Sequence, residues 1–211
     1  MKDFSVVLYG RTMTGKSTLM EILTHGNGKS IGHGAQRTTL DVRSYYWEGL
    51  KITDVPGIGS FDGREDDRLA FEAAKSADLV LFLISDDAPQ AEEAKHLADL
   101  RQLGKPVLGI VNVKMAINPA QKKLALRNLQ KRLSDTERLG EVCKQFKAYA
   151  KRYGQDWSQI PFVYTHLNAA FMGQPERNND KELYAASGFP VVEQYILDKV
   201  RRDGCFIRSK T

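Results

Sequence analysis

The most constraining feature of the chain is an apolar run that leads through a glycine-bounded loop into a helical pattern. Residues 4–9 are mostly apolar, residues 10–17 read GRTMTGKS, and residues 18–23 repeat apolar side chains at helical spacing. Glycines at positions 10 and 15 let the backbone wrap tightly and turn its N–H groups inward. The following helix adds the positive end of its dipole. The pattern is therefore typical of a loop that cradles phosphate groups.

Each residue of this loop has an expected part in holding a chain of phosphates. Lys16 can reach the terminal phosphates, and the hydroxyl of Ser17 can ligate Mg²⁺. The alternative, a plain glycine-rich turn before a helix, is disfavoured because the flanking strand and helix are the context that the pattern requires. The residues predicted to contact a nucleotide here are Gly10, Arg11, Thr12, Met13, Thr14, Gly15, Lys16, Ser17 and Thr18.

The composition bounds the size and the location of the protein. With 211 residues, 42% of them hydrophobic and 27% charged, the chain is long enough for one domain with a substantial core. No apolar run approaches the roughly 18 residues that a membrane span needs. Cys143, Cys205 and four scattered histidines give no spacing for a disulfide framework or for a metal cluster of His and Cys. We therefore expect a cytoplasmic protein, with peripheral attachment to the inner membrane as the alternative.

A second polar cluster follows a predicted β-hairpin over residues 40–53. Asp54-Val55-Pro56-Gly57 ends the second strand of that hairpin. A carboxylate at this place suits coordination of Mg²⁺ through water, and the N–H of Gly57 is available to a terminal phosphate. The D-x-x-G pattern is weak alone, but it stands about 37 residues after the phosphate loop, which makes it informative.

Apolar runs alternate with helical patterns along the rest of the chain. Runs at 79–84, 107–113 and 160–164 predict buried strands, with helices between them and a last helix at 189–202. This alternation predicts an α/β fold whose sheet is mostly parallel, with one antiparallel strand from the hairpin and helices on both faces. We expect one domain over residues 1–203 and a basic tail at residues 204–211.

Taken together, these features resemble the Era-like branch of the translation-factor-like GTPases. The resemblance rests on residues 10–17, 38–41 and 54–57 and on a strand that ends in Asn112, and it covers residues 4–202. It implies the three-layer P-loop NTPase fold and an Mg²⁺-dependent switch that binds GTP and hydrolyses it to GDP. In that family a threonine of the first mobile loop ligates Mg²⁺, a role that falls on Thr39, with Thr38 as the second choice.

The resemblance also implies the roles of individual residues. Lys16 and Thr39 would be catalytic, and Gly57 would contact the terminal phosphate. Mg²⁺ would be held by Ser17, by Thr39 and, through water, by Asp54.

Three departures from the family pattern weaken parts of this interpretation. The base-reading motif N/T-K-x-D is replaced by Asn112-Val113-Lys114-Met115, so no aspartate is in place for guanine. Ile58 stands where Ras-like proteins have a water-orienting glutamine, and Met13 stands where potassium-activated members have asparagine. We expect slow hydrolysis and a weakened guanine preference. The residues predicted to contact the base are Asn112, Lys114, His166 and Leu167.

Two alternatives remain open on the sequence alone. One is a nucleotide-holding scaffold or assembly module with negligible hydrolysis, and the other is an ATP-using P-loop protein. A catalytic group missing from the chain could also be supplied by a homodimer across the nucleotide face or by a partner. Arg37 and Gln36 are the local candidates for such a group.

The basic charge of the chain is concentrated in one segment. Residues 114–152 hold eleven Lys and Arg against three acids, whereas the rest of the chain carries a net charge of −3. This segment belongs to a predicted helical insertion at about 114–158. It is read either as two solvated helices or as a docking surface for an anionic membrane, RNA or a ribosome. A break is predicted near Ser134-Asp135, and the helix after it has an apolar packing stripe at helical spacing, made up of Leu139, Val142, Cys143, Phe146, Ala150 and Tyr153. The aromatic residues of the segment follow this stripe, so stacking on RNA bases is not indicated.

Overall fold

The fold is built on one six-stranded sheet. The computed structural model describes residues 4–26, 42–47, 50–58, 63–175 and 177–208. The strand order is β2-β3-β1-β4-β5-β6, and every neighbouring pair is parallel except β2 and β3. The predicted α/β fold and its antiparallel hairpin are confirmed. The strands are β1 Ser5–Gly10, β2 Arg43–Trp47, β3 Leu50–Asp54, β4 Leu79–Ser85, β5 Val107–Asn112 and β6 Phe162–Thr165.

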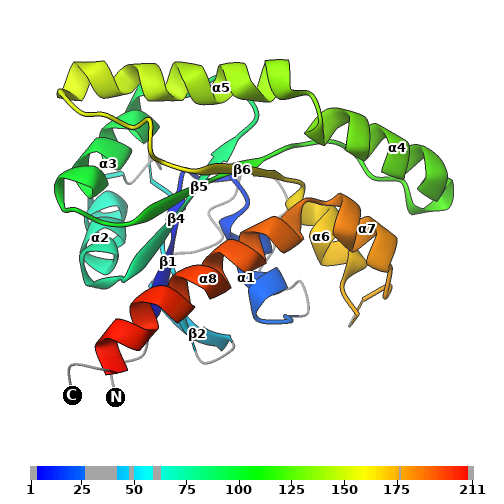
Figure 1. Ribbon diagram of the computed structural model, residues 1–211, viewed down its shortest axis with the longest axis horizontal. Coiled ribbons are helices and arrows are strands. Elements are labelled where there is room, and N and C mark those ends of the chain that lie inside the picture. Colours follow the sequence, from blue (N-terminus) through cyan, green and yellow to red (C-terminus); the bar gives the residue numbers. More distant parts are fainter. Residues whose placement is uncertain (1–3, 27–41, 48–49, 59–62, 176, 209–211) are drawn as a thin grey trace.

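Helices cover both faces of the sheet, which gives the molecule three layers (Figure 1). Helices α2, α3 and α5 pack on one face, and α1 and α8 pack on the other. The helices are α1 Lys16–Leu23, α2 Gly63–Ser76, α3 Ala91–Gln102, α4 Lys122–Leu133, α5 Thr136–Ala148, α6 Leu167–Gly173, α7 Lys181–Ala186 and α8 Phe189–Arg208, with short 3₁₀ turns η1 Pro119–Gln121 and η2 Tyr149–Tyr153.

The two central strands supply side chains to both layers. In β1, Val6 and Leu8 enter the core beneath α1 and α8, whereas Val7 and Tyr9 enter the core beneath α2 and α3. All seven residues of β4 are buried in the same alternating way. A parallel strand buried on both faces needs such a continuous apolar run, and this fixes the strands whose ends carry the site.

Several elements differ from the sequence expectation. Helices α6 and α7 lie in residues 167–186, where no helix was predicted, and α8 runs to Arg208, past the predicted end at residue 202 and into the expected tail. Both short helices are capped by side chains: His166 accepts from the N–H of Ala169, and Asp180 accepts from the N–H of Leu183. Helices of this length depend on such caps and on tertiary packing rather than on periodicity.

The predicted packing stripe of the basic segment is confirmed for most of its length. Leu139, Cys143 and Phe146 are buried on α5, and the predicted break before α5 is an N-cap at Asp135. The stripe ends early because α5 gives way to η2, which leaves Tyr153 38% exposed and stacked on Trp157. None of the helices in the described ranges has the length and apolar character to cross a bilayer.

Candidate nucleotide-binding site

The loop between β1 and α1 has a backbone that only glycine allows at two places. Gly10 has φ 154° and Gly15 has φ 109°. A Cβ atom on Gly10 would lie 2.4 Å from the carbonyl oxygen of Leu83, and one on Gly15 would lie 2.6 Å from Nδ2 of Asn112. Both glycines are therefore needed for the close approach of the loop to the ends of β4 and β5.

Lys16 is the charged group at the centre of this loop. Its side chain is buried, and Nζ donates to the carbonyl oxygens of Gly10 at 2.9 Å and of Arg11 at 3.1 Å. Burial lowers the pKa of Lys16 to about 8, and the charge of Asp54 partly opposes this shift. The ammonium group thus lies in a dry site among neutral carbonyls, where a bound anion gains most.

Asp54 stands at the end of β3, opposite Leu8 of β1, and is only 2% exposed. Together with the hydroxyl of Ser17 it offers hard oxygen donors beside Lys16, and these are the ligands that Mg²⁺ takes. The donor set fits the ion. Thr39, which was predicted to complete it, and Thr38, the second choice for that role, lie outside the described residues.

The segment after Asp54 lies directly against the phosphate loop. The N–H of Ile58 donates to the carbonyl oxygen of Gly10 at 3.2 Å, and Arg11 and Ile58 form a parallel bridge. A Cβ on Gly57 would lie 2.3 Å from Oγ1 of Thr12, a buried hydroxyl oxygen without a hydrogen-bond partner in the described part of the chain. Gly57 therefore borders a polar atom of the loop, at the place where a phosphate oxygen was predicted.

Ile58 itself has no chemistry to offer a nucleotide. Its side chain is 1% exposed and belongs to the core beneath α2 and α3. At the position where Ras-like proteins have a glutamine, this chain thus has a buried core residue, Ile58.

Two side chains of the predicted phosphate set point elsewhere. The guanidinium of Arg11 lies 3.5 Å from Glu93 and 3.8 Å from Asp87, near the start of α3. Burial raises the pKa of Glu93. Met13 has φ 67° and is 58% exposed. The guanidinium of Arg11 is therefore engaged with acids near α3, and the side chain of Met13 is exposed to solvent.

Asn112 connects the phosphate loop to the start of α6. Its Nδ2 donates to the carbonyl oxygen of Thr14 at 3.0 Å, and its Oδ1 accepts from the N–H of Leu167 at 3.2 Å. Two of the predicted base contacts are thus bonded to each other. In this arrangement Asn112 positions the loop, with one N–H and the oxygen of its amide engaged inside the protein.

His166 is likewise occupied by hydrogen bonds. Its Nδ1 accepts from the N–H of Ala169, so Nε2 carries the proton and donates to the carbonyl oxygen of Met115 at 2.9 Å. Burial lowers its pKa, which keeps the ring neutral. The side chain of His166 therefore holds α6 to the chain after β5 and does not face a base.

Lys114 is the one predicted base contact in this group whose side chain is exposed. Its backbone N–H donates to Oδ1 of Asp86 at 3.1 Å, and the other carboxylate oxygen of Asp86 accepts from Arg132 at 2.6 Å. Met115, in the place of the family aspartate, packs on the apolar cluster around Leu129. The loop after β5 is thus fastened by Asp86 on one side and by His166 on the other.

Asp86 was not singled out in the sequence, although it is only 7% exposed and supports the predicted base loop. It directly follows the buried strand β4, whose carboxyl end lies beside that of β5. A carboxylate at that place could have been found as a neighbour of Asn112 from the strand order.

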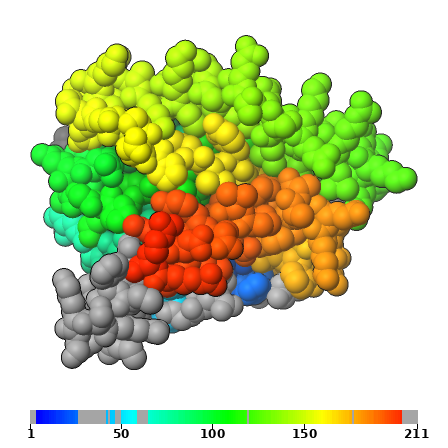
Figure 2. Space-filling view, in the orientation of Figure 1, coloured from blue at the N-terminus to red at the C-terminus, as the bar shows by residue number. Residues whose placement is uncertain are grey.

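Several groups of the basic segment are paired within the chain. Lys122 binds Asp180 at 2.9 Å and Glu182 at 3.0 Å, and Arg132 binds Asp86. In Figure 2, α4 and α5 form a ridge along one edge of the molecule. The basic side chains of this segment that are exposed are Lys114, Lys122, Lys123, Arg127, Lys131, Arg138, Lys144, Lys151 and Arg152.

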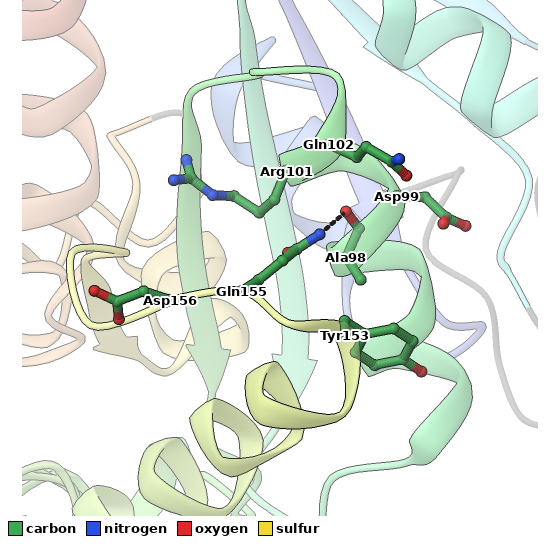
Figure 3. Close-up of a pocket in the computed structure, with 7 residues that line it drawn as sticks. All are labelled: Ala98, Asp99, Arg101, Gln102, Tyr153, Gln155 and Asp156. Atoms are coloured by element: carbon green, nitrogen blue, oxygen red, sulfur yellow. Dashed lines mark hydrogen bonds between the residues drawn. The ribbon is translucent and has the colours of Figure 1, made fainter.

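Among the described residues, at least two sizeable surface hollows lie outside the phosphate loop. One, of about 480 Å³, is lined by the end of α3 and by the chain after η2, where Gln155 donates to the carbonyl oxygen of Ala98 at 2.9 Å (Figure 3). Because α3 runs back along the sheet, this hollow lies at the edge opposite the loop. The other, of about 640 Å³, is an acidic groove between residues 86–88 and the start of α5.

Comparison with known proteins places the chain in a family. A sequence model described as "50S ribosome-binding GTPase" matches residues 5–113, just over half of the chain. The chain belongs to this GTPase family. The matched range includes the phosphate loop, Asp54, Gly57 and Asn112. The predicted resemblance to Era-like P-loop GTPases is confirmed.

Curated relatives of this family member are distant and longer. The chain is 30% identical to GTPase Der of Pseudothermotoga lettingae over 131 residues, which is 57% of the chain and 29% of that protein. It is 30% identical to GTPase Era of Clostridium botulinum over 128 residues, which is 57% of the chain and 43% of that protein. The chain spans between 26% and 29% of the lengths of the first three relatives.

Solved structures agree on the fold. A structure of Era in complex with MgGDPNP and nucleotides 1506–1542 of 16S ribosomal RNA aligns with a TM-score of 0.58 at 16% identity, covering 94% of the chain and 57% of that chain. A bacterial selenocysteine-specific elongation factor aligns with a TM-score of 0.59 at 15% identity, covering 96% of the chain and 29% of that chain. The three-layer fold of the GTPases is therefore shared over nearly the whole chain.

Proposed function

We propose that this GTPase family member binds GTP with Mg²⁺ and hydrolyses it slowly to GDP as a conformational switch. The observation that carries the proposal is the buried Lys16, enclosed by the glycine-bounded loop beside Asp54. Among the described residues, this buried cation meets two carbonyl oxygens and one neighbouring carboxylate, an arrangement that is poised for an anion.

In the proposed reaction the chain positions the phosphates and stabilises negative charge. Lys16 and the N–H groups of the loop would hold the terminal phosphates while a water attacks in line. Ser17, Thr39 and, through water, Asp54 would hold Mg²⁺, which when bound supplies further positive charge at the transferring group. After hydrolysis the loss of the terminal phosphate would release the segments around Thr39 and Gly57.

Hydrolysis by the isolated chain should be slow because Ile58 is packed in the core and cannot orient a water. Intrinsic rates of related switches without a stimulating group are on the order of 10⁻⁴ to 10⁻³ s⁻¹. We propose that a partner, or a homodimer across the nucleotide face, supplies the missing group. Arg37 and Gln36, the local candidates, lie outside the described residues.

Single-turnover hydrolysis of γ-labelled GTP tests this function. Slow, Mg²⁺-dependent release of phosphate is expected, with none from Lys16→Ala. Thr39→Ala should lower hydrolysis much more than GDP binding, because a switch threonine meets the metal only with the triphosphate bound. Equal losses of GDP and GTP binding in Thr39→Ala would contradict the switch. A rate that rises with protein concentration supports the homodimer, and a rate independent of dilution removes it.

A nucleotide-holding scaffold with negligible turnover is the second candidate. It is favoured by the packed side chain of Ile58 and by Met115 in the place of the family aspartate. Tight GTP binding without phosphate release over many hours, with or without added partner, would select it. ATP binding as tight as GTP binding would select the ATP-using alternative.

The basic helices suggest a partner for the switch. We propose a single G domain over residues 1–203, whose insertion at about 114–158 docks on an anionic membrane, RNA or a ribosome. The exposed lysines of α4 and α5 support this, and the Era structure was solved with ribosomal RNA. Binding to anionic vesicles or RNA should weaken steeply with salt. Charge reversal at Lys144, Lys147 and Lys151 that leaves such binding intact would return these helices to a purely structural role.

A further inference from the structure

A histidine and two carboxylates, none of them assigned to the nucleotide, meet between α2 and α3. Asp67 comes from α2, and Glu92 and His96 lie one turn apart on α3. One ligand atom from each of the three lies within 4.8 Å of the other two. A pair at positions i and i+4 points to the same side of a helix, so α3 presents both groups toward Asp67.

The imidazole of His96 is held in one orientation by the core. Its Nδ1 lies 3.1 Å from the hydroxyl of Tyr9, a residue of β1 that is 0% exposed. The other ring nitrogen, Nε2, therefore faces the two carboxylates. A metal-binding histidine is commonly oriented in this way, with a polar partner on the nitrogen that does not bind the ion.

The spacing of His96 and Asp67 suits a shared ion better than a direct hydrogen bond. Nε2 of His96 lies 3.5 Å from Oδ2 of Asp67. An N–H···O hydrogen bond is usually about 2.7–3.2 Å long. Two ligands of one tetrahedral ion with bonds of about 2.0–2.1 Å stand about 3.3 Å apart. The observed separation is close to the second value.

We propose that Asp67, Glu92 and His96 bind one divalent transition-metal ion of the Zn²⁺ class, which bridges α2 and α3. One imidazole and two carboxylates suit such borderline ions, whereas Mg²⁺ prefers ligands that are all oxygen. Glu92 is exposed and Asp67 is partly exposed, so the ion reaches the site from solvent while His96 stays buried. This site does not depend on the proposed hydrolysis of GTP.

The bridge would act on the segment that borders the phosphate loop. Helix α2 follows residues 54–58 along the chain, and α3 begins beside the carboxylates that hold Arg11. An ion shared by the two helices limits their relative movement and stabilises the folded state by binding it alone.

Calorimetric titration of the full chain with ZnCl₂, in buffer with excess MgCl₂ and no nucleotide, tests the site. We expect one equivalent to bind with a Kd on the order of micromolar or tighter, and Co²⁺ in its place to give the absorption of a four- or five-coordinate ion. Glu92→Gln and Asp67→Asn should each weaken binding at least tenfold. Tyr9→Phe, which keeps the ring and removes the hydroxyl, should weaken binding by about 10- to 100-fold.

Matched controls separate this site from surface binding of the metal. His25→Gln removes an exposed histidine elsewhere, and Glu72→Gln removes an exposed carboxylate of α2. Neither should change the titration. No binding below about 1 mM, or one-equivalent binding that is unchanged in Glu92→Gln and Asp67→Asn, would overturn the proposal. Because Glu92 is exposed, its variant decides the matter even if His96→Gln does not fold.

Discussion

The phosphate end and the base end of the candidate site are held together in opposite ways. At the phosphate end, Lys16 is bonded to carbonyl groups five and six residues away in the chain. At the base end, Asp86 binds the N–H of Lys114 across 28 residues, and His166 binds the carbonyl of Met115 across 51. The lysine of the first region thus finds its partners within its own loop, which Asn112 also ties to α6, and the second region depends on distant residues. Substitutions should therefore separate the two ends.

Lys16→Ala should have the largest effect, because it removes the buried cation of the phosphate end. Loss of its contacts to a charged phosphate chain should cost about 3 kcal/mol or more, at least a hundredfold in affinity. GDP and inorganic pyrophosphate should both be affected, since both depend on this group. Calorimetry with the two ligands measures the effect, and Lys123→Ala, at an exposed lysine of α4, is the control. Unchanged affinity for both ligands would exclude the phosphate-loop interpretation.

The second largest effect should be a reduced discrimination between guanine and adenine. Without the family aspartate we expect GDP to bind more tightly than ADP, but with a discrimination about 10- to 150-fold below that of a relative with the full motif. Titrations of GDP, ADP and xanthosine diphosphate, beside the Era protein of Clostridium botulinum, measure it. Equal affinities for GDP and ADP would contradict a guanine preference.

Met115→Asp should not restore that selection, which sharpens the same comparison. The side chain of Met115 packs on the apolar cluster around Leu129, Ala169 and Leu183. A carboxylate placed in this apolar cluster would destabilise the fold and would not face a bound base. A gain of guanine discrimination with unchanged stability would show that this loop can turn outward.

The affinity of the phosphate end for anions should depend on pH, and this effect should be smaller than the preceding ones. The pKa of Lys16 is about 8 in the folded chain against 10.5 for an ordinary lysine. The charged form is lost above about pH 8, so pyrophosphate should bind roughly tenfold more weakly at pH 9 than at pH 7. The free energy of unfolding of the ligand-free chain should instead rise with pH. Burying a charged ammonium costs the folded state about 3 kcal/mol, and this cost disappears between pH 8 and 10.5 as Lys16 loses its proton. Lys16→Ala should lack both trends.

Asp86→Asn should have the smallest effect on nucleotide binding, and this effect should be confined to the base end. The amide can still accept from the N–H of Lys114, but the charge that pairs with Arg132 is lost. We expect a loss of about 1–2 kcal/mol in unfolding free energy and a several-fold weaker affinity for GDP, with pyrophosphate unchanged. Urea unfolding and calorimetry measure these. Asp87→Asn, at a neighbouring acid whose side chain is 61% exposed, is the control.

The same contrast explains what the sequence could predict. The sheet and its layers follow from continuous apolar runs such as that of β4, and the phosphate loop follows from two glycines and a lysine at fixed spacing. The uses of Asn112, His166 and Asp86 do not follow, because each hydrogen bond joins residues that only the folded sheet brings together. Short helices such as α6 and α7 were not predicted for a related reason, since they depend on their caps and packing more than on apolar periodicity.

The buried thiol of Cys143 can report how often helix α5 separates from the sheet. Its thiol is 8% exposed, lies 3.5 Å from the hydroxyl of Tyr164, and has a pKa that burial raises. A maleimide in solution needs an exposed thiolate, so this sulfur should react only when α5 lifts from the sheet. In a Cys205→Ser background, the labelling rate of this one atom would follow how often the layer that covers β4, β5 and β6 detaches. Nucleotides and metal ions could then be ranked by how far each slows that event.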